Sequence, residues 1–568
     1  MSSNCDYDVL IVGCGPVGVV AAHLLGQSGL SVLVIERDHQ PYDLPRAIHL
    51  DHEIMRIFQS LGLAELLLPQ LSMPAGAMHF GADRGVIRQF QAIVNTDRLG
   101  WGSDYFFYQP DMERALRSAL ADRETVTVRL GQRVVGVAQD DEGVSVLTQG
   151  GDGGLAVRAQ YVLACDGGRS TVRNQVGIPL EDLGFDEPWL VVDALVDGPV
   201  VMPDLTGTPD GVDMQQVMFI LGDPARPTSV IPGVGRHRRW EFMMLPNESA
   251  EDFADPAAVK PLLAPWLGET PFEIVRAAAY RFHALLAERW RSRRVLLVGD
   301  AAHQTPPFFG QGLCHGLRDA ANLAWKLRMV IEGSADATLL DTYQSERLPQ
   351  VRSVVEASMR VGRYICTRDP DAARRRDIEM REVALRTPPG YVDIIPSLKA
   401  GVLAPSRSEP SPNGSRFIQP PIINADGART LLDDATGKGF VLLARPFVAL
   451  DRISIDAAFE RELGLERVTI VADDRSRHAP EGSVLDVTGE LTKWLDYFGC
   501  AGVLLRPDFY VYGVFSTIEE GIEMLQALRG QIAPPAGVHG SDAADDQSAL
   551  TTKTTAKKCA RDPQPNTF

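Results

Sequence analysis

Cysteine is scarce in this chain, and no two cysteines are spaced as C-x-x-C. The seven cysteines are scattered and odd in number, which argues against a disulfide framework and against a structural zinc site. We therefore expect a reducing compartment and no bound metal ion.

Long apolar runs and a surplus of basic residues are also missing. Residues 9–26 resemble the core of a signal peptide, but residues 1–8 carry two aspartates and no lysine or arginine. No other segment reaches the ~18 uninterrupted apolar residues of a membrane span. Lys and Arg number 56 against 74 Asp and Glu, giving a net charge of −18, which disfavours nucleic acids and anionic membranes as partners. We expect a cytoplasmic protein whose partners are small molecules.

What the chain does have is the composition of a globular protein, with 45% hydrophobic and 23% charged residues over 568 positions. At about 100–200 residues per domain, this length indicates three or four domains. Periodicity and composition predict an α/β (α+β) fold. Residues 1–180 and 286–366 are expected to form one domain, with long helices at its end, and residues 181–285 a β-rich insertion within it. Residues 367–415 are expected to be a linker, 416–530 a smaller α/β domain, and 531–568 a disordered tail.

The first motif lies in a strand–helix–strand unit at residues 8–36. Its glycines are Gly13, Gly15 and Gly18, with Pro16 at the start of the helix. In such a turn the first glycine permits the sharp bend, the second lets the backbone approach a pyrophosphate, and the third lets the helix pack on the strand. Glu36 ends the second strand, where a carboxylate can bind ribose hydroxyls. This motif predicts a dinucleotide site without distinguishing NAD from FAD.

Two further motifs follow buried strands. Residues 164–173 read ACDGGRSTVR and place Asp166 at the end of a strand, and residues 298–303 read VGDAAH and place Asp300 likewise. An aspartate at a strand end can accept hydrogen bonds from sugar hydroxyls. Gly310, Gln311 and Gly312 then precede a long helix, whose N-terminus suits negative charge.

Taken in order, the three motifs resemble those of the FAD-dependent aromatic hydroxylases, the group of p-hydroxybenzoate hydroxylase and phenol hydroxylase. The resemblance spans about residues 7–365 and implies a Rossmann-like FAD-binding domain with an inserted β-rich substrate domain. The FAD contacts that it implies are Gly13, Gly15, Pro16, Gly18, Glu36, Arg37, Arg46, Gln109, Asp166, Gly167, Asp300, Pro307, Gly310, Gln311 and Gly312.

Within that group the chain is most similar to 3-(3-hydroxyphenyl)propionate hydroxylases, on the strength of residues 42–53, 295–327 and 339–350. His49 and His52 stand where smaller or acidic residues are expected. Residues 416–530 resemble the thioredoxin-like domain appended to phenol hydroxylases. Because they lack a C-x-x-C, we expect a structural role for this domain.

The resemblance implies a flavoprotein monooxygenase of aromatic catabolism. NADH or NADPH reduces the flavin, O2 adds to give a C4a-hydroperoxide, and a phenolic acid such as 3-(3-hydroxyphenyl)propionate is hydroxylated to a catechol. A homodimer is a family-level expectation. The alternatives are the same chemistry on another phenol, a heteroaromatic or a polyketide-like ring, an FAD-binding protein without catalysis, and a flavin oxidase that inserts no oxygen.

The candidates for activating the phenol are histidines, because a nearby base favours the phenolate. They are His49, His303 and His315, and each could instead be a hydrogen-bonded structural histidine, a reading that we favour for His303. An arginine of the β-rich layer could clamp a propionate carboxylate. The residues expected at the substrate pocket are Gln216, Arg239, Pro306, Pro307, Phe308 and Phe309.

Overall fold

The computed structural model describes residues 5–90, 96, 98–151, 153–386, 393–406, 409–472 and 480–533. The tail predicted at residues 531–568 lies outside the described residues from position 534 onward. In the described part, no helix combines the length and the apolar character needed to cross a membrane.

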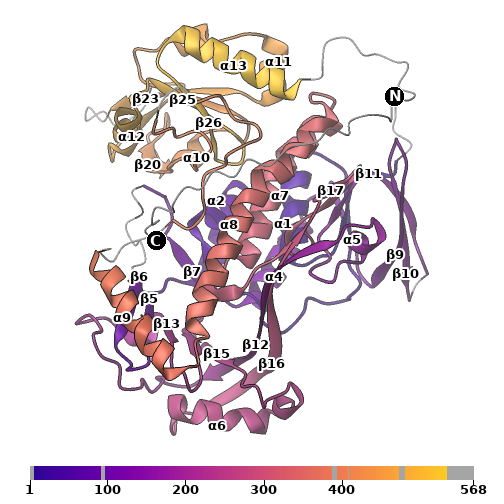
Figure 1. Cartoon of the computed structure of the whole chain (residues 1–568). Helices are drawn as coiled ribbons and strands as arrows, with labels where there is room; N and C mark the ends of the chain where they lie inside the picture. The colour runs from indigo at the N-terminus through magenta and orange to yellow at the C-terminus, as the bar shows by residue number, and fades with distance from the viewer. Residues whose placement is uncertain are drawn as a thin grey trace, which may run out of the picture. The chain divides into compact units, whose positions relative to one another are not determined.

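The first sheet carries the predicted strand–helix–strand unit. Its central strands β8, β2, β1, β11 and β18 are parallel neighbours in that order. Helices α1 and α7 contact each other at this sheet, and Figure 1 shows both near β11 and β17. The strands are β1 (Tyr7–Val12), β2 (Val32–Ile35), β8 (Val126–Arg129), β9 (Gln132–Gln139), β10 (Val144–Gly150), β11 (Ala156–Ala164), β17 (Arg291–Ser292) and β18 (Val295–Leu297).

The second sheet is the predicted β-rich layer, with one difference. Its order is β19-β16-β12-β15-β14-β13-β5-β6, so strands from before and after residues 181–285 complete it. Strand β5 joins by parallel pairing with β13. The strands are β5 (Gly76–Phe80), β6 (Val86–Phe90), β12 (Leu180–Val196), β13 (Val217–Leu221), β14 (Thr228–Ile231), β15 (His237–Met243), β16 (Phe272–Ala287) and β19 (His303–Gln304).

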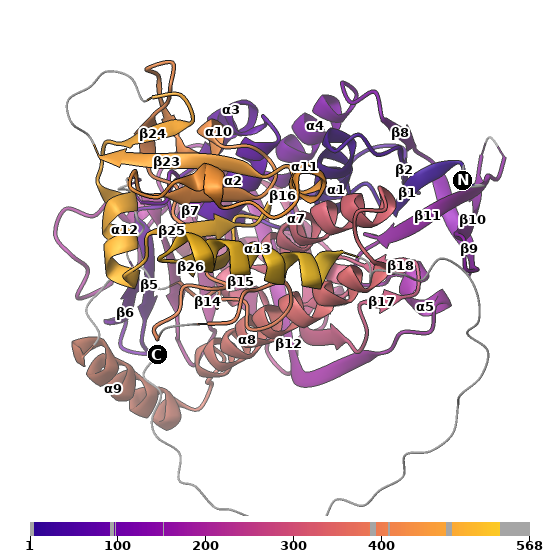
Figure 2. The same cartoon turned by 90° about the horizontal axis from the view of Figure 1, so that it is seen from above.

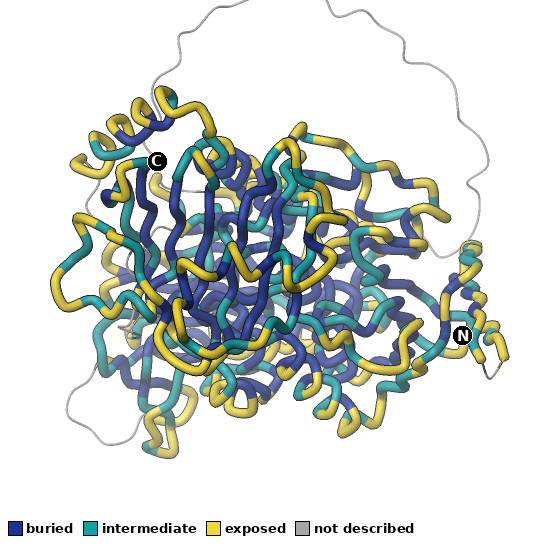
Figure 3. The backbone as a smooth tube through the Cα atoms, turned by 90° about the horizontal axis from the view of Figure 1, so that it is seen from below, coloured by how far each residue is buried: buried dark blue, intermediate teal, exposed yellow. Residues whose placement is uncertain are grey.

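Alternation along the strands divides this second sheet into two faces. One face, with Leu190, Val192, Trp240 and Phe242, joins a buried hydrophobic cluster that also includes α6 (Pro256–Leu267). The residues between them on the same strands point to the opposite face, toward the first sheet. Figure 3 shows these strands as mostly buried, with exposed residues concentrated in the loops.

The remaining helices of this half are α1 (Pro16–Gln27), α2 (His52–Ser60), α3 (Ala64–Leu67), α4 (Gln109–Leu120), α5 (Thr171–Gln175), α7 (Gly312–Ile331), α8 (Asp341–Ile365) and α9 (Pro370–Arg386). A small third sheet pairs β3 (His49–Asp51) and β4 (Leu71–Ser72) with β7 (Asp104–Phe107).

Helix α9 lies inside the stretch predicted to be a linker at 367–415, and this part of the prediction is wrong. The helix is highly charged, and only Ala373, Arg376 and Asp377 are buried in it. It is tied down by polar contacts: Asp377 accepts a hydrogen bond from the amide of Ala82 (2.7 Å), and Arg376 donates to the carbonyl of Gly222 (2.8 Å). Such contacts with distant segments leave no apolar periodicity in the sequence.

The C-terminal domain is a seven-stranded sheet of order β21-β20-β24-β23-β22-β25-β26. Strands β24, β23 and β22 are parallel, β25 runs antiparallel to β22, and β26 runs antiparallel to β25, in a thioredoxin-like arrangement. Its elements are β20 (Pro421–Ile423), β21 (Arg429–Leu431), α10 (Leu432–Ala435), β22 (Val441–Ala444), α11 (Ala457–Leu463), β23 (Glu466–Ala472), β24 (Ser483–Asp486), α12 (Glu490–Phe498), β25 (Gly502–Leu505), β26 (Val511–Phe515) and α13 (Ile518–Ile532).

Buried ion pairs attach the C-terminal domain to the helices of the first domain. Arg506 and Asp508, between β25 and β26, pair with each other, and Arg506 also pairs with Glu346 of α8 (2.7 Å). Arg56 of α2 donates to Asp433 (2.8 Å). Trp325 and Met329 of α7 also share a buried hydrophobic cluster with residues of β25, β26 and α13, and Figure 2 views these three elements in front of α7.

Candidate active site

A cavity of about 940 Å³ lies between the first and second sheets. Residues of all three sequence motifs line it, among them Gly13, Gly15, Asp166 and Asp300. These residues end strands β1, β11 and β18 or follow them directly, at the edge where open α/β sheets bind ligands. The opposite wall is the inward face of the second sheet.

The glycine turn leaves the backbone bare toward the cavity. Gly13 has φ of +102°, and a Cβ there would lie 2.4 Å from the carbonyl oxygen of Cys165. A Cβ on Gly18 would lie 2.0 Å from the carbonyl oxygen of Gly13, so Gly18 packs helix on strand and does not line the cavity. Gly15 has no atom within 4 Å of its Cβ position. The open space beside Gly15, at the N-terminus of α1, fits a pyrophosphate.

Glu36 closes the same turn from the end of β2. Its Oε2 accepts a hydrogen bond from the amide of Cys14 (2.7 Å), and its Oε1 accepts one from the amide of Asp38 (3.0 Å). Both Glu36 and Arg37 line the cavity. A carboxylate offers about four acceptor positions, so Glu36 retains capacity for ribose hydroxyls.

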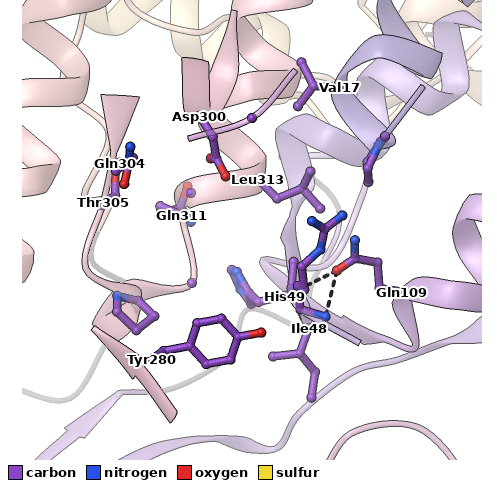
Figure 4. Close-up of a pocket in the computed structure, with 18 of the residues that line it drawn as sticks. Val17, Ile48, His49, Gln109, Tyr280, Asp300, Gln304, Thr305, Gln311 and Leu313 are labelled. Carbon is purple, nitrogen blue, oxygen red and sulfur yellow. Dashed lines mark hydrogen bonds between the residues drawn. The ribbon is translucent and has the colours of Figure 1, made fainter. Parts of the chain in front are cut away.

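Gln109 holds the loop that carries Arg46. Its Oε1 accepts hydrogen bonds from the amides of Arg46 (3.0 Å) and Ala47 (2.6 Å), drawn as dashed lines in Figure 4. Its Nε2 donates to Glu113 (2.6 Å). The side chain of Arg46 lines the cavity and provides a positive charge there.

The two aspartates differ in their surroundings. Asp166 accepts hydrogen bonds from the hydroxyl of Ser170 and from the amide of Val172 (3.1 Å). Asp300 makes no hydrogen bond or ion pair among the described residues, and it faces the cavity. Desolvation raises the pKa of the Asp300 carboxyl, although His303 and Arg46 act against this. An unpartnered carboxylate fits the hydroxyls of a ribityl chain.

The N-terminus of α7 completes the cradle. Pro307 begins a short 3-10 helix, Gly310 takes a left-handed conformation at φ +64°, and Gly312 starts α7 with no atom within 4 Å of its Cβ position. The side chain of Gln311 accepts from Arg318 (3.0 Å), which fixes this turn. The residues of this segment that line the cavity, together with Gly167, are Pro307, Gly310, Gln311 and Gly312. The donor set therefore fits FAD: bare backbone at the pyrophosphate, carboxylates for the sugars, and a helix N-terminus for the ring.

His49 is the candidate histidine that the structure brings to the cavity. It begins β3, whose pairing with β7 places Asp104 beside it, and His49 Nε2 lies 2.8 Å from Asp104 Oδ1. Burial lowers the pKa of His49, but the bond and charge of Asp104 outweigh it and raise the pKa well above the usual range. His49 Nδ1 is buried beside Gly310 and has no hydrogen-bond partner among the described residues. Figure 4 shows His49 between Gln311 and Tyr280.

His303 and His315 do not reach the cavity, and both are fully buried. His303 Nε2 lies 2.7 Å from Asp319, which also accepts from Arg347 (2.9 Å). Burial and the charge of Arg347 lower the pKa of His315 well below its usual range. The environment of both side chains is that of structural histidines.

The residues predicted for the substrate pocket separate into two groups. Pro307, Phe308, Phe309 and Arg239 line the cavity, whereas Pro306 and Gln216 do not. Phe308 packs edge-on against Trp189 at 5.9 Å between ring centroids, so it belongs to the wall and to the core.

Arg239 is not free to clamp a carboxylate. Its Nε donates to Asp193 (2.8 Å), its Nη1 to the carbonyl of Arg46 (2.7 Å), and its Nη2 to Asp193 (3.2 Å) and the carbonyl of Pro45 (3.3 Å). Among the arginines of this layer, Arg239 is therefore committed to other partners, because its guanidinium joins the second sheet to the loop before β3.

Sequence reasoning did not find Asp104, Glu241 or Arg276, which also line the cavity. Glu241 stands two positions after Arg239, so the alternation of β15 was a signal that both face the same way. Asp104 becomes a partner of His49 only through the pairing of two short strands 55 residues apart.

Comparison with known proteins agrees with this geometry. The model of a family described as "FAD binding domain" matches residues 6–358, and that of the "HcaD C-terminal domain" matches residues 414–531. A probable NADH-specific resorcinol 4-hydroxylase of Rhodococcus jostii (strain RHA1) is 37% identical over 533 residues, 93% of this chain and 95% of the relative. A 3-(3-hydroxy-phenyl)propionate/3-hydroxycinnamic acid hydroxylase 2 of Burkholderia vietnamiensis (strain G4 / LMG 22486) is 36% identical, covering 89% and 92%.

Solved structures show the same fold. Aklavinone-11 hydroxylase, in a ternary complex with FAD and aklavinone, superposes with a TM-score of 0.71 at 24% identity, covering 93% of this chain and 99% of that chain. The flavin-dependent monooxygenase PieE, in complex with FAD and substrate, gives a TM-score of 0.75 at 23% identity with the same coverage. The chain therefore belongs to the family defined by this FAD-binding domain, and within it to the FAD-dependent aromatic hydroxylases.

Proposed function

We propose that the protein uses NADH or NADPH and O2 to hydroxylate a phenol that carries a second polar group at the meta position, giving a catechol. The names of two relatives support this substrate class, because resorcinol and 3-(3-hydroxyphenyl)propionate are both meta-substituted phenols. The observation that carries the proposal is the His49–Asp104 pair in the same cavity as the FAD cradle.

In this proposal the three motifs hold FAD, which supplies the redox chemistry with O2 when it is bound. The turn from Gly13 to Gly15 takes the pyrophosphate, Glu36 takes the adenosine ribose, and Asp300 takes the ribityl hydroxyls. The N-terminus of α7, which lines the cavity, would favour negative charge on the bound flavin. Pro307 and the two phenylalanines after it restrict water beside the ring, which strengthens electrostatic interactions there.

His49 activates the phenol. Because Asp104 holds Nε2 and raises the pKa, His49 is protonated near neutral pH and places a positive charge at the wall of the cavity. A phenol ordinarily ionises near pH 10, and a nearby positive charge stabilises the phenolate at lower pH. The phenolate ring is the more electron-rich and is the form that attacks an electrophilic oxygen.

We also propose a cytoplasmic location with no nucleic-acid or membrane partner, which the net charge of −18 supports. A homodimer is proposed from the family alone, and light scattering after size-exclusion chromatography tests it.

The test of the activity is oxidation of NADH and of NADPH by the FAD-loaded protein, with O2 uptake, peroxide and product measured together. Resorcinol and 3-(3-hydroxyphenyl)propionate serve as substrates. We expect one of them to stimulate nucleotide oxidation, with about one O2 consumed per hydroxylated product. Stimulation that yields only peroxide, with every phenol tried, would show an oxidase and contradict the proposal.

A further inference from the structure

The cavity contains a carboxylate that nothing described so far employs. Glu241 stands on β15 and is 8% exposed, and that remaining exposure faces the cavity. Among the described residues its side chain makes no hydrogen bond and no ion pair. A buried carboxylate without a partner is costly, and such groups concentrate where a ligand supplies the missing partner.

The neighbours of Glu241 provide no compensation. Across the strands it is paired with Val191 on β12 and with Ser229 on β14. Ile220 and Ile231, also on the cavity wall, make this part of the sheet mostly apolar. Tyr280, which Figure 4 shows at the cavity, belongs to the same sheet.

The nearest cation is already used. Arg239 lies two residues before Glu241 on the same face, but its guanidinium is bound to Asp193 and to two backbone carbonyls. It lowers the pKa of Glu241 only partly, because burial dominates and raises that pKa to about 7. At pH 8 the group is therefore mainly an anion that lacks a hydrogen-bond donor.

We infer that Glu241 accepts a hydrogen bond from the second polar group of the substrate, so that this group is a hydroxyl and not a carboxylate. The inference rests on the proposed function and narrows its substrate class to benzenediols such as resorcinol. A hydroxyl donates to the carboxylate, whereas the carboxylate of an arylpropionate would repel it in a place from which water is largely excluded.

Arg276 is the residue that could oppose this selection. It lines the cavity, its Nη1 donates to the carbonyl of Pro45, and its buried Nη2 has no hydrogen-bond partner among the described residues. In the register of the strands Arg276 lies in the row of Asp193 and Arg239, and Glu241 lies in the next row, opposite Val191. The two residues therefore present opposite charges to different parts of the cavity, and variants can separate their effects.

The test compares the binding of resorcinol and 3-(3-hydroxyphenyl)propionate to the FAD-loaded protein at pH 8. Dissociation constants come from the change in flavin absorbance, and kcat/KM comes from NADH oxidation coupled to product. The variants are Glu241→Gln and Glu241→Leu. Glu273→Gln, which changes an exposed glutamate of β16 in the same sheet, is the matched control.

We expect the unmodified protein to bind resorcinol at least 10-fold more tightly than the arylpropionate. Loss of a hydrogen bond to a charged acceptor should weaken resorcinol binding about 10-fold in Glu241→Gln and up to about 100-fold in Glu241→Leu. Both variants should bind the arylpropionate more tightly, and Glu273→Gln should match the unmodified protein. FAD content and melting temperature confirm that the variants fold.

Tighter binding of the arylpropionate by the unmodified protein would overturn the inference, most directly if Arg276→Gln abolished that binding. An unchanged preference in both Glu241 variants would overturn it equally. These outcomes are distinct from failure of the proposed function, which would appear as nucleotide oxidation without hydroxylated product. The dissociation constants decide the role of Glu241 in either case.

Discussion

Replacing Glu346 with glutamine should loosen the attachment of the C-terminal domain. Glu346 Oε1 accepts from the amide of Val402 (2.8 Å) and from Arg506 (3.0 Å). Its Oε2 accepts from Asn322, Lys326 and Arg506, each at 2.7 Å. With Asp508, the group holds two buried cations and two buried anions, so it is balanced in charge.

The substitution removes one anion and leaves an excess positive charge in the interior. Arg506 retains Asp508, but Lys326 loses its carboxylate partner. The pKa of Lys326 is already lowered to about 8 by burial, and it would fall further. Breaking a buried pair in this way costs about 3–5 kcal/mol. Roughly 500 described residues unfold with about 1 kcal/mol per degree, so the melting temperature should fall by about 3–5 °C.

The assay is thermal unfolding of the FAD-loaded protein, with limited proteolysis to report the release of the C-terminal domain. Glu356→Gln is the matched control, because Glu356 lies on the same helix and is exposed. A melting temperature and a cleavage pattern that match the control would refute the reasoning. They would mean that this network contributes no net attachment energy.

Three further outcomes follow from the site. Gly15→Ala places a methyl group in the open cavity, so it should weaken FAD binding about 10-fold or more without lowering the stability of the FAD-free protein. FAD release followed by fluorescence checks this, with Gly530→Ala on α13 as the control, and an unchanged affinity for FAD would contradict the assignment of Gly15 to the pyrophosphate site. Asp104→Asn removes the group that raises the pKa of His49, so the alkaline limb of the pH profile of kcat/KM should move to lower pH. A pH profile identical to that of the unmodified protein would show that protonated His49 is not the active form. In the folded state the pKa of Glu241 is about 7, against an ordinary 4.5, so its contribution to stability is greatest below about pH 4.5 and falls by about 3 kcal/mol as the pH rises through 7. Glu241→Gln should abolish this loss of stability, and melting temperatures of the two proteins that change in parallel from pH 5 to pH 8 would contradict the prediction.

The parts of the site that local sequence determines could be predicted, because turn and cap residues act within a few positions. The turn from Gly13 to Gly18, the two aspartates at strand ends and the glycines before α7 are of this kind. The His49–Asp104 pair and the cavity position of Glu241 depend on strand pairing and register, which are set by distant segments. Arg239 was expected at the substrate pocket, and the sequence could not show that its guanidinium is bound to Asp193, which lies on a strand 46 residues earlier.

Among the helices and strands, too, those set by local sequence could be predicted, and those set by distant segments could not. Elements with a strong apolar pattern, such as α7 and β1, appear where the sequence predicts them. Helix α9 did not, because charged side chains cover most of it and its attachment to Ala82 and Gly222 is polar. Strands β5 and β19 were not predicted, and they lie in the second sheet only through their pairing with β13 and β16.

The mixed origin of the second sheet limits how substrate preference can be exchanged between relatives. A chimaera that transplanted only residues 181–285 would leave β5, β6 and β19 from the recipient at the two ends of the sheet. The pairing of β5 with β13 and of β19 with β16 would then join strands from two different parents at the wall of the cavity. Engineering by recombination therefore has to move three separate stretches together, or alter single side chains such as Glu241 within an unchanged sheet.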